Sequence, residues 1–144
     1  MSSGLVARIL AAAAADPMRE VCGLLTGAPD RVSGIQPCAN VAADPATRFE
    51  IDPAALLTAH RRARLGGPAI IGCYHSHPTG RAEPSPRDAA DAAPDGSLWL
   101  IVADGRIGAW RAVSGGARHG RFDPVTLRCD AGEASTGLKN EENR

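Results

Sequence analysis

The sequence of 144 residues contains few aromatic side chains and carries no net charge. Aromatic residues make up only 3 % of the chain, so the hydrophobic core must be built from Leu, Ile, Val and Ala. Lys and Arg together balance Asp and Glu at 16 each, which gives no bulk attraction to nucleic acid or to an anionic membrane. The scarcity of aromatics also removes the base-stacking surface of single-strand-binding proteins, so no nucleic-acid partner is expected.

The sequence also lacks cysteines in the C-x-x-C spacing and apolar segments long enough to span a membrane. The cysteines are Cys22, Cys38, Cys73 and Cys129. None of them forms a C-x-x-C pair, which disfavours a thiolate zinc site, and we expect reduced, mostly buried thiols in a cytoplasmic protein. No segment approaches the ~18 apolar residues of a transmembrane helix, so no membrane association is expected. The apolar segment Leu5–Ala15 faintly resembles a signal peptide, but no Lys or Arg precedes it and Arg8 interrupts it, so we predict a first helix.

Periodicity and turn residues predict one domain with the element order α-β-β-α-β-α-β-β-β. A chain of this length can bury a single core, and no linker or internal repeat divides it. The fold class is therefore α/β or α+β, with a mixed sheet flanked by helices. The polar stretch 130–144 is expected to be a flexible C-terminal tail, which leaves 1–129 as the folded domain.

Turn and capping residues mark the boundaries of these elements. After the first helix we expect a strand at Val21–Gly27, a hairpin partner at Arg31–Gln36, a helix opened by Asp52-Pro53, a strand at Ala69–Tyr74, a helix opened by Ser85-Pro86 and ended by Asp95-Gly96, a hairpin of Leu98–Ala103 with Arg106–Val113, and a last strand within Phe122–Cys129.

Polar side chains with metal-binding chemistry follow the strand that ends at Tyr74. His75 and His77 are two residues apart, and alternate side chains of an extended chain share a face. Asp88 lies in the first turn of the next predicted helix, which can fold back toward the strand end. Two imidazoles and one carboxylate are a ligand set of catalytic zinc sites, with the fourth position left for water. Glu20, just before the first strand, is the best candidate for the base that this water needs.

Each of these residues also has an ordinary structural explanation. A histidine at a strand end is usually solvated or hydrogen bonded, and an H-x-H pair alone is weak evidence of a ligand pair. Ser85 and Asp88 have the pattern of a helix N-cap with its partner, and Glu20 fits a plain helix-to-strand connection. It is the joint arrangement that favours a metal site. His60 and His119 match no motif and are expected to be ordinary surface or helix residues.

Together these segments resemble the JAMM, or MPN+, metalloprotease family. Its pattern is a glutamate before a glycine-containing first strand, then H-x-H-P, then a serine and an aspartate separated by two residues. The chain matches it with Glu20-Val21-Cys22-Gly23, His75-Ser76-His77-Pro78 and Ser85-Pro86-Arg87-Asp88, and the likeness extends from the first helix to near Val113.

The resemblance implies a cytidine-deaminase-like MPN/JAMM domain that binds Zn²⁺ through His75, His77 and Asp88. It also implies that Glu20 is the general base and later the acid that protonates the leaving amine, and that Ser85 donates a hydrogen bond to the developing oxyanion. Because Ser85 can also cap the helix, serving both partners would demand a geometric compromise, and which duty dominates stays open. Ser76 should point away from the two ligands and is expected to be structural.

The short chain without long insertions resembles the compact bacterial branch of this family. By that resemblance the substrate is a ubiquitin-like sulfur-carrier protein of the ThiS/MoaD type, cleaved at a peptide or isopeptide bond of its C-terminal tail. We expect the tail to lie between the segment Asn40–Pro53 and the loop Thr79–Pro84. Two alternatives stay open, a zinc hydrolase of a small amide and a metal-binding scaffold module without a catalytic role. The sequence does not decide the oligomeric state, and a homodimer also stays open.

Overall fold

The computed structural model describes residues 1–130 and has the helices and strands in the predicted order. The helices are α1 (Ser3–Ala15), α2 (Pro53–Arg64) and α3 (Pro86–Asp91), and the strands are β1 (Cys22–Ala28), β2 (Arg31–Cys38), β3 (Ile70–Ser76), β4 (Leu98–Ala103), β5 (Arg106–Gly116) and β6 (Gly120–Val125). The segment 131–144 lies outside the described residues, so the predicted tail and the domain boundary at residue 129 stay predictions.

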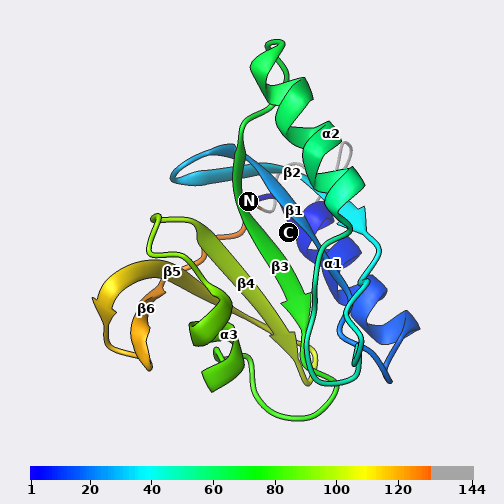
Figure 1. The fold of residues 1–144 in the computed structure, drawn as a ribbon, viewed down its shortest axis with the longest axis vertical. Coiled ribbons are helices and arrows are strands. Elements are labelled where there is room, and N and C mark those ends of the chain that lie inside the picture. The colour runs from blue at the N-terminus through cyan, green and yellow to red at the C-terminus, as the bar shows by residue number, and fades with distance from the viewer. Residues whose placement is uncertain (131–144) are drawn as a thin grey trace, which may run out of the picture.

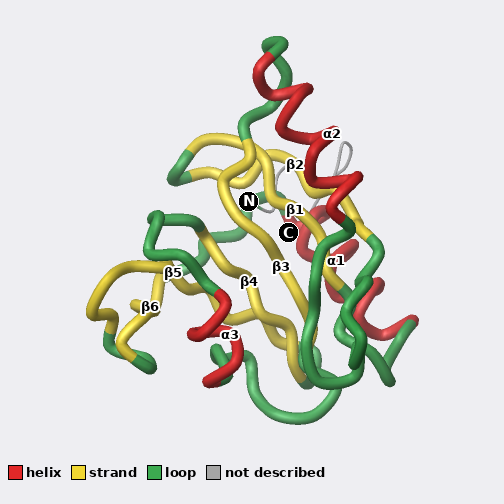
Figure 2. The backbone as a smooth tube through the Cα atoms, viewed as in Figure 1, coloured by secondary structure: helices red, strands yellow, loops and turns green. Residues whose placement is uncertain are grey.

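The strands form one mixed sheet in the order β2-β1-β3-β4-β5-β6 (Figures 1 and 2). β3 and β4 are parallel, and every other neighbouring pair is antiparallel. A parallel pair needs a crossover connection, and α3 lies on the one between β3 and β4. α1 lies on one face of the sheet, while α2 and α3 lie on the other (Figure 1). This architecture confirms the predicted mixed sheet flanked by helices.

Strand β3 sends alternate side chains into two separate cores. Tyr74 packs with Ile9 of α1 in the core on one face of the sheet. Cys73 packs with Trp99 on the opposite face, where α3 lies. Because side chains alternate along a strand, His75 shares the Cys73 face, and its ring meets the edge of the Trp99 ring with centroids 5.6 Å apart. The polar end of β3 therefore opens on the α3 side of the sheet.

Several element boundaries differ by a few residues from the sequence prediction; for example, β3 continues to Ser76 and β5 to Gly116, beyond their predicted ends at Tyr74 and Val113. α3 ends at Asp91 instead of continuing to the Asp95-Gly96 turn, because Pro94 disfavours the helical conformation in the residue before it. β6 begins at Gly120 and ends at Val125, earlier than the predicted range Phe122–Cys129, because its pairing with β5 covers only those residues.

The burial of the cysteine side chains agrees only in part with the prediction. All four cysteines are free, but only Cys22 is buried, Cys38 and Cys73 are half-buried, and Cys129 is exposed. Among residues 1–130, no helix has the length and apolar character needed to cross a bilayer.

Gly23 in β1 makes room for a buried aromatic ring. Gly23 is paired directly with Tyr74 of β3. A Cβ atom at Gly23 would overlap the phenol ring of Tyr74, whose residue is only 1 % exposed. The glycine is therefore required by packing, because the ring has no free space into which it can move.

We expect Gly23→Ala to lower the free energy of unfolding by about 1–3 kcal/mol through overpacking against Tyr74. The control is Gly4→Ala in α1, where a Cβ atom meets only Ser2 Oγ at 3.9 Å and alanine favours the helix by up to about 1 kcal/mol. Urea unfolding of the three proteins measures both effects. Equal stability of Gly23→Ala and the unmodified protein would contradict the packing argument.

Candidate metal centre

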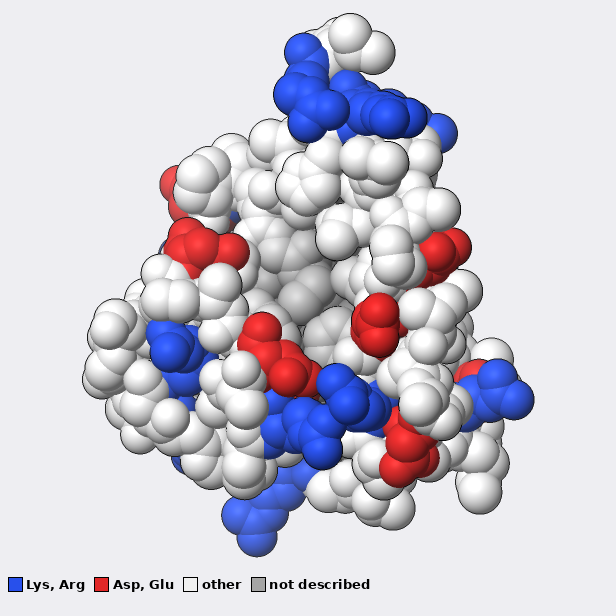
Figure 3. Space-filling model, viewed as in Figure 1, with Lys and Arg blue, Asp and Glu red and all other residues white. Residues whose placement is uncertain are grey.

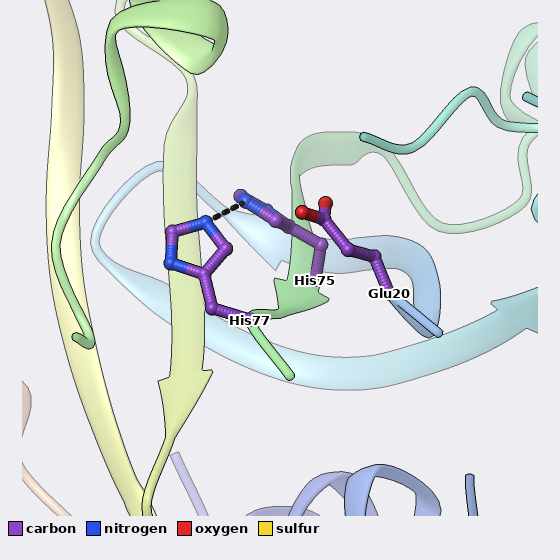
Figure 4. Close-up of side chains that lie close together, drawn as sticks. All are labelled: Glu20, His75 and His77. Atoms are coloured by element: carbon purple, nitrogen blue, oxygen red, sulfur yellow. Dashed lines mark hydrogen bonds between the residues drawn. The ribbon is translucent and has the colours of Figure 1, made fainter. Parts of the chain in front are cut away.

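The antiparallel pairing of β1 and β3 brings Glu20 beside the two histidines. Cys22 at the start of β1 pairs with His75 near the end of β3, so the residue that precedes β1 reaches the end of β3. Figure 4 shows the carboxylate of Glu20 directed toward the imidazoles of His75 and His77. Ligand atoms of these three residues lie within 4.8 Å of one another.

A second carboxylate, that of Asp88, lies closer to the same histidines. Asp88 Oδ2 is 3.1 Å from His75 Nε2 and 3.2 Å from His77 Nε2. The two Nε2 atoms are 3.1 Å apart, so the three atoms form a nearly equilateral triangle. Four ligands at 2.0–2.1 Å around zinc are separated by about 3.3 Å in a tetrahedron. The triangle therefore has the size of one face of such a tetrahedron.

The hydrogen bonds of His77 favour a positive charge at the Nε2 corner of this triangle, carried either by a proton or by a metal ion in its place. His77 Nδ1 lies 2.8 Å from the carbonyl oxygen of Arg81, which can only accept, so Nδ1 carries a proton. Burial lowers the pKa of His77, but its hydrogen bonds to Asp88 and to Arg81 outweigh burial and raise the pKa. Burial lowers the pKa of His75, which keeps that imidazole neutral, as a metal ligand must be. The residues present thus fit a divalent cation.

The two carboxylates differ in their pKa. Burial raises the pKa of Asp88, but its interactions with His75, His77 and the Ser85 N–H outweigh burial and hold the pKa well below its usual range. Burial raises the pKa of Glu20 to about 7. Glu20 Oε1 is buried and has no hydrogen-bond partner among residues 1–130. Asp88 is therefore suited to be an anionic ligand, and Glu20 to exchange a proton near neutral pH.

Ser85 begins α3 and also lines the site. Its Oγ accepts a hydrogen bond from the Asp88 N–H at 3.0 Å, and its own N–H donates to Asp88 Oδ2 at 2.9 Å, which completes a capping box. A hydroxyl has one donor and two acceptor positions, so the cap leaves the Ser85 proton free for another partner. The cap therefore leaves a donor position for an oxyanion, and which of the two duties of Ser85 dominates stays open.

Ser76 connects the Glu20 segment to β3. Its Oγ accepts from the Val21 N–H at 2.9 Å and donates to the Arg19 carbonyl at 3.4 Å, and its own N–H donates to the Val21 carbonyl at 3.0 Å. The residue between the two histidines therefore holds the main chain on both sides of Glu20. This agrees with the structural role predicted for Ser76.

A cavity of about 400 Å³ opens beside the triangle. Glu20, His77 and Ser85 all line it. The other lining residues are Ala46 and Thr47 from the segment before α2, residues of the loop 78–84, and Arg118 and His119 from the turn between β5 and β6. Both segments between which the sequence analysis expects a substrate tail contribute walls to this cavity, and the position of the tail stays a prediction.

Two residues of the turn between β5 and β6 make contacts that the sequence analysis missed. His119 Nε2 lies 3.1 Å from the Pro84 carbonyl oxygen, so this exposed histidine also contacts the residue before Ser85. Arg118 forms an ion pair with Glu83 and lies 5.2 Å from the centroid of the Trp110 ring. The contacts with Glu83 and Pro84 join residues 35 positions apart, and no local motif marks them.

A larger groove of about 550 Å³ lies next to the site. Figure 3 shows the hollow between α2 and α3, with Lys and Arg side chains gathered beyond one end of it. Ile71, Cys73 and Trp99 are among its lining residues. Phe49 stacks on His75 with ring centroids 4.3 Å apart and meets the Trp99 ring edge-on at 5.7 Å. Phe49 therefore contacts both the metal-binding triangle and a wall of this groove.

Comparison with known protein families identifies the family of this chain. The model of the Prok-JAB family, described as prokaryotic homologs of the JAB domain, matches residues 2–113. The chain belongs to this family. The match confirms the resemblance to JAMM proteins, and it ends before the β5–β6 turn that carries His119.

Two curated relatives and one solved structure are similar to this chain. A desampylase from Haloferax volcanii is 39 % identical over 98 residues, which cover 66 % of this chain and 70 % of the relative. A probable TtuB-protein conjugate cleaving protease from Thermus thermophilus is 40 % identical over 74 residues, 51 % of this chain and 49 % of the relative, so the match spans about half of that protein. A JAB1/MPN domain protein from Archaeoglobus fulgidus shares the fold, with a TM-score of 0.55 and 23 % identity over 89 % of this chain and 95 % of the other.

We expect the protein to bind one zinc ion through the triangle of His75, His77 and Asp88. The variants His75→Ala and Asp88→Asn should lose zinc affinity by at least about tenfold, because each removes or neutralises one ligand. Glu20→Gln should keep it, because its carboxylate lies outside the triangle. Zinc content after equilibrium dialysis, measured by plasma mass spectrometry, checks these expectations. Zinc loss in Glu20→Gln with retention in Asp88→Asn would reverse the roles of the two carboxylates.

Proposed function

We propose that this protein is a zinc metallopeptidase that hydrolyses a peptide or isopeptide bond at the C-terminal tail of a small ubiquitin-like protein. The observation that carries the proposal is the ligand triangle, with Glu20 and Ser85 beside it at one cavity. Membership of the Prok-JAB family supports a JAB-domain peptidase or isopeptidase. The names of the relatives, a desampylase and a protease that cleaves TtuB-protein conjugates, support a ubiquitin-like protein as the substrate.

In this proposal His75, His77 and Asp88 hold Zn²⁺. When bound, the ion lowers the pKa of water and polarises the scissile carbonyl. The neutral imidazole of His75 and the anionic carboxylate of Asp88 are the protonation states that such ligands require. The Arg81 carbonyl accepts the Nδ1 proton of His77 and so directs the Nε2 lone pair of this ring into the triangle.

Glu20 is the proton carrier of the proposed reaction. Its carboxylate accepts a proton from the attacking water and returns it to the nitrogen of the leaving amine. Oε1 has no competing partner among the described residues, and burial raises the pKa of Glu20 to about 7, where uptake and release of a proton are both accessible. General acid–base catalysis of this kind contributes about 10²–10⁴-fold to the rate.

Ser85 stabilises the charge that develops on the carbonyl oxygen. Its hydroxyl proton is not used by the helix cap and can be donated into the cavity that Ser85 lines. The capping box fixes the serine main chain, so the donor is positioned before the substrate arrives.

The proposed substrate is a sulfur-carrier protein of the ThiS/MoaD type in the cytoplasm. Its tail would lie in the cavity between the segment Asn40–Pro53 and the loop Thr79–Pro84, which supply Ala46, Thr47 and residues 79–81, 83 and 84 of the walls. Glycines in such a tail let its backbone approach the ligand triangle closely. Every group in this mechanism comes from one chain, so the proposal requires no dimer.

The test is to incubate the zinc-loaded protein with a sulfur-carrier protein extended by one C-terminal cysteine, and with the same carrier joined to a lysine side chain through an isopeptide bond. Intact masses report cleavage. We expect the unmodified protein to release the added group and Glu20→Gln to release it at least about 10²-fold more slowly while retaining zinc. Turnover of small acyl-amino acids alone would favour the small-amide hydrolase, and no turnover with zinc bound would favour the scaffold.

We expect Ser85→Ala to lower kcat by about 10²–10³-fold, because it removes the oxyanion donor. The same change removes a helix cap and should cost about 0.5–2 kcal/mol of stability. Ser2→Ala is the matched control, because Ser2 caps α1 by accepting from the Leu5 N–H at 3.2 Å. Steady-state kinetics and thermal unfolding separate the two effects. Equal loss of kcat in both variants would assign the loss at Ser85 to capping alone.

A further inference from the structure

We propose that Asn40 is a positioning residue that holds Glu20 in the place where it can act as the proton carrier. This inference rests on the proposed function, because it concerns the geometry of the base in that reaction. Asn40 follows β2 and opens the segment that leads to α2. Its side chain contacts the main chain of Glu20, which is 20 positions earlier in the sequence.

The side-chain amide of Asn40 uses all of its hydrogen-bonding capacity. Nδ2 donates to the Glu20 carbonyl at 2.8 Å and to the Arg48 carbonyl at 3.0 Å. Oδ1 accepts from the N–H groups of Ala42 and Glu50, both at 3.0 Å. Two donors and two acceptors are the full complement of an amide, and the identity of the four partners fixes its orientation.

The same segment holds the main chain of Glu20 from both sides. The Glu20 N–H donates to the Pro45 carbonyl at 2.7 Å, and the Glu20 carbonyl accepts from Asn40. The segment is closed at its base by the pairing of Asn40 with Ile51 and by the bond from the Val41 N–H to the Glu50 carbonyl at 2.9 Å. Glu20 is thus held by a closed loop, with the Asn40 amide bonding across its interior.

The loop also reaches one of the proposed ligands. Phe49, the neighbour of Arg48, stacks on the ring of His75. Asn40 therefore fixes the distance between the Glu20 main chain and the part of the loop that packs on His75. All four partners of the amide are main-chain atoms, so Asn40 acts on geometry and takes no part in proton transfer.

The energetic consequence follows from the length of the Glu20 side chain. A glutamate carboxylate is reached through several rotatable bonds, so a small displacement of its main chain moves the carboxylate away from the histidines. A misplacement of 1 Å in a reacting group costs about 10²-fold in rate. No other side chain provides two donors and two acceptors at this length, because aspartate lacks the donors and glutamine is one methylene longer.

The experiment compares Asn40→Asp and Asn40→Ala with Asp95→Ala. Asn40→Asp keeps the shape and the acceptors but removes both donors. Asp95→Ala is the control, because it removes a 3.0 Å bond from the Ser97 N–H to Asp95 Oδ1 in a turn that does not line the cavity of the proposed substrate tail. Cleavage of the carrier conjugate gives kcat and KM, plasma mass spectrometry gives zinc content, and hydrogen–deuterium exchange gives the protection of residues 40–51.

For both Asn40 variants we expect kcat to fall about tenfold to a hundredfold, KM to change less than about threefold, and zinc to be retained. Exchange at the Ala42 and Glu50 amides should rise in Asn40→Ala, which lacks their acceptor. In a Glu20→Gln background, adding Asn40→Asp should cause no further loss, because the base through which Asn40 acts is already absent. Asp95→Ala should behave like the unmodified protein.

Three outcomes would overturn this inference. The first is an unchanged kcat in both Asn40 variants while Glu20→Gln is inactive. The second is loss of zinc or of folding in both variants, which would assign Asn40 to general stability. The third is an equal loss of residual rate on adding Asn40→Asp to Glu20→Gln. Failure of the proposed function is a separate result, recognised when the unmodified, zinc-loaded protein cleaves no carrier substrate.

Discussion

The start of α3 and the ligand triangle both depend on one atom, Asp88 Oδ2. This oxygen accepts from the Ser85 N–H and faces the Nε2 atoms of His75 and His77 at 3.1 and 3.2 Å. α3 has only 6 residues, and a helix so short has little stability of its own. Its first turn is therefore held by the capping box and by the interaction of the Asp88 carboxylate with the two imidazoles. A cation in the triangle would fix Ser85 as well, since both residues belong to one capping box.

Two residues within the motif segments, Gly23 and Ser76, have packing roles. Gly23 is the position at which the Tyr74 ring passes β1, and Ser76 bonds the main chain on both sides of Glu20 to β3. Neither takes part in proton transfer or ligation in the proposed mechanism. They keep β1 and β3 in the register that sets Glu20 opposite the histidines. The motif segments therefore contain residues with proposed chemical roles and also residues that fit two antiparallel strands together.

The sequence predicted what is encoded locally. The Asp52-Pro53 and Ser85-Pro86 helix starts are short-range signals, and the shared face of His75 and His77 follows from strand alternation. The contacts of Asn40 and His119 were not predictable. Each joins a loop side chain to a main-chain carbonyl far away in the sequence, 20 positions for Asn40 and 35 positions for His119. Such contacts depend on how the loops fold over the sheet, and no periodicity in the chain encodes that geometry.

The assignment of two carboxylates to two roles follows from their hydrogen bonds and not from their burial. Asp88 and Glu20 are 4 % and 5 % exposed, so desolvation raises the pKa of each. Asp88 receives hydrogen bonds from two imidazoles and one N–H, whereas Glu20 Oε1 receives none within residues 1–130 and the charge of His77 offsets only part of the effect of burial on the Glu20 pKa. Equal burial with unequal compensation separates their pKa values, as it does in carboxylate pairs that divide ionised and proton-transferring roles. The protein creates this difference by holding the Glu20 main chain through hydrogen bonds while Oε1 has no hydrogen-bond partner among residues 1–130.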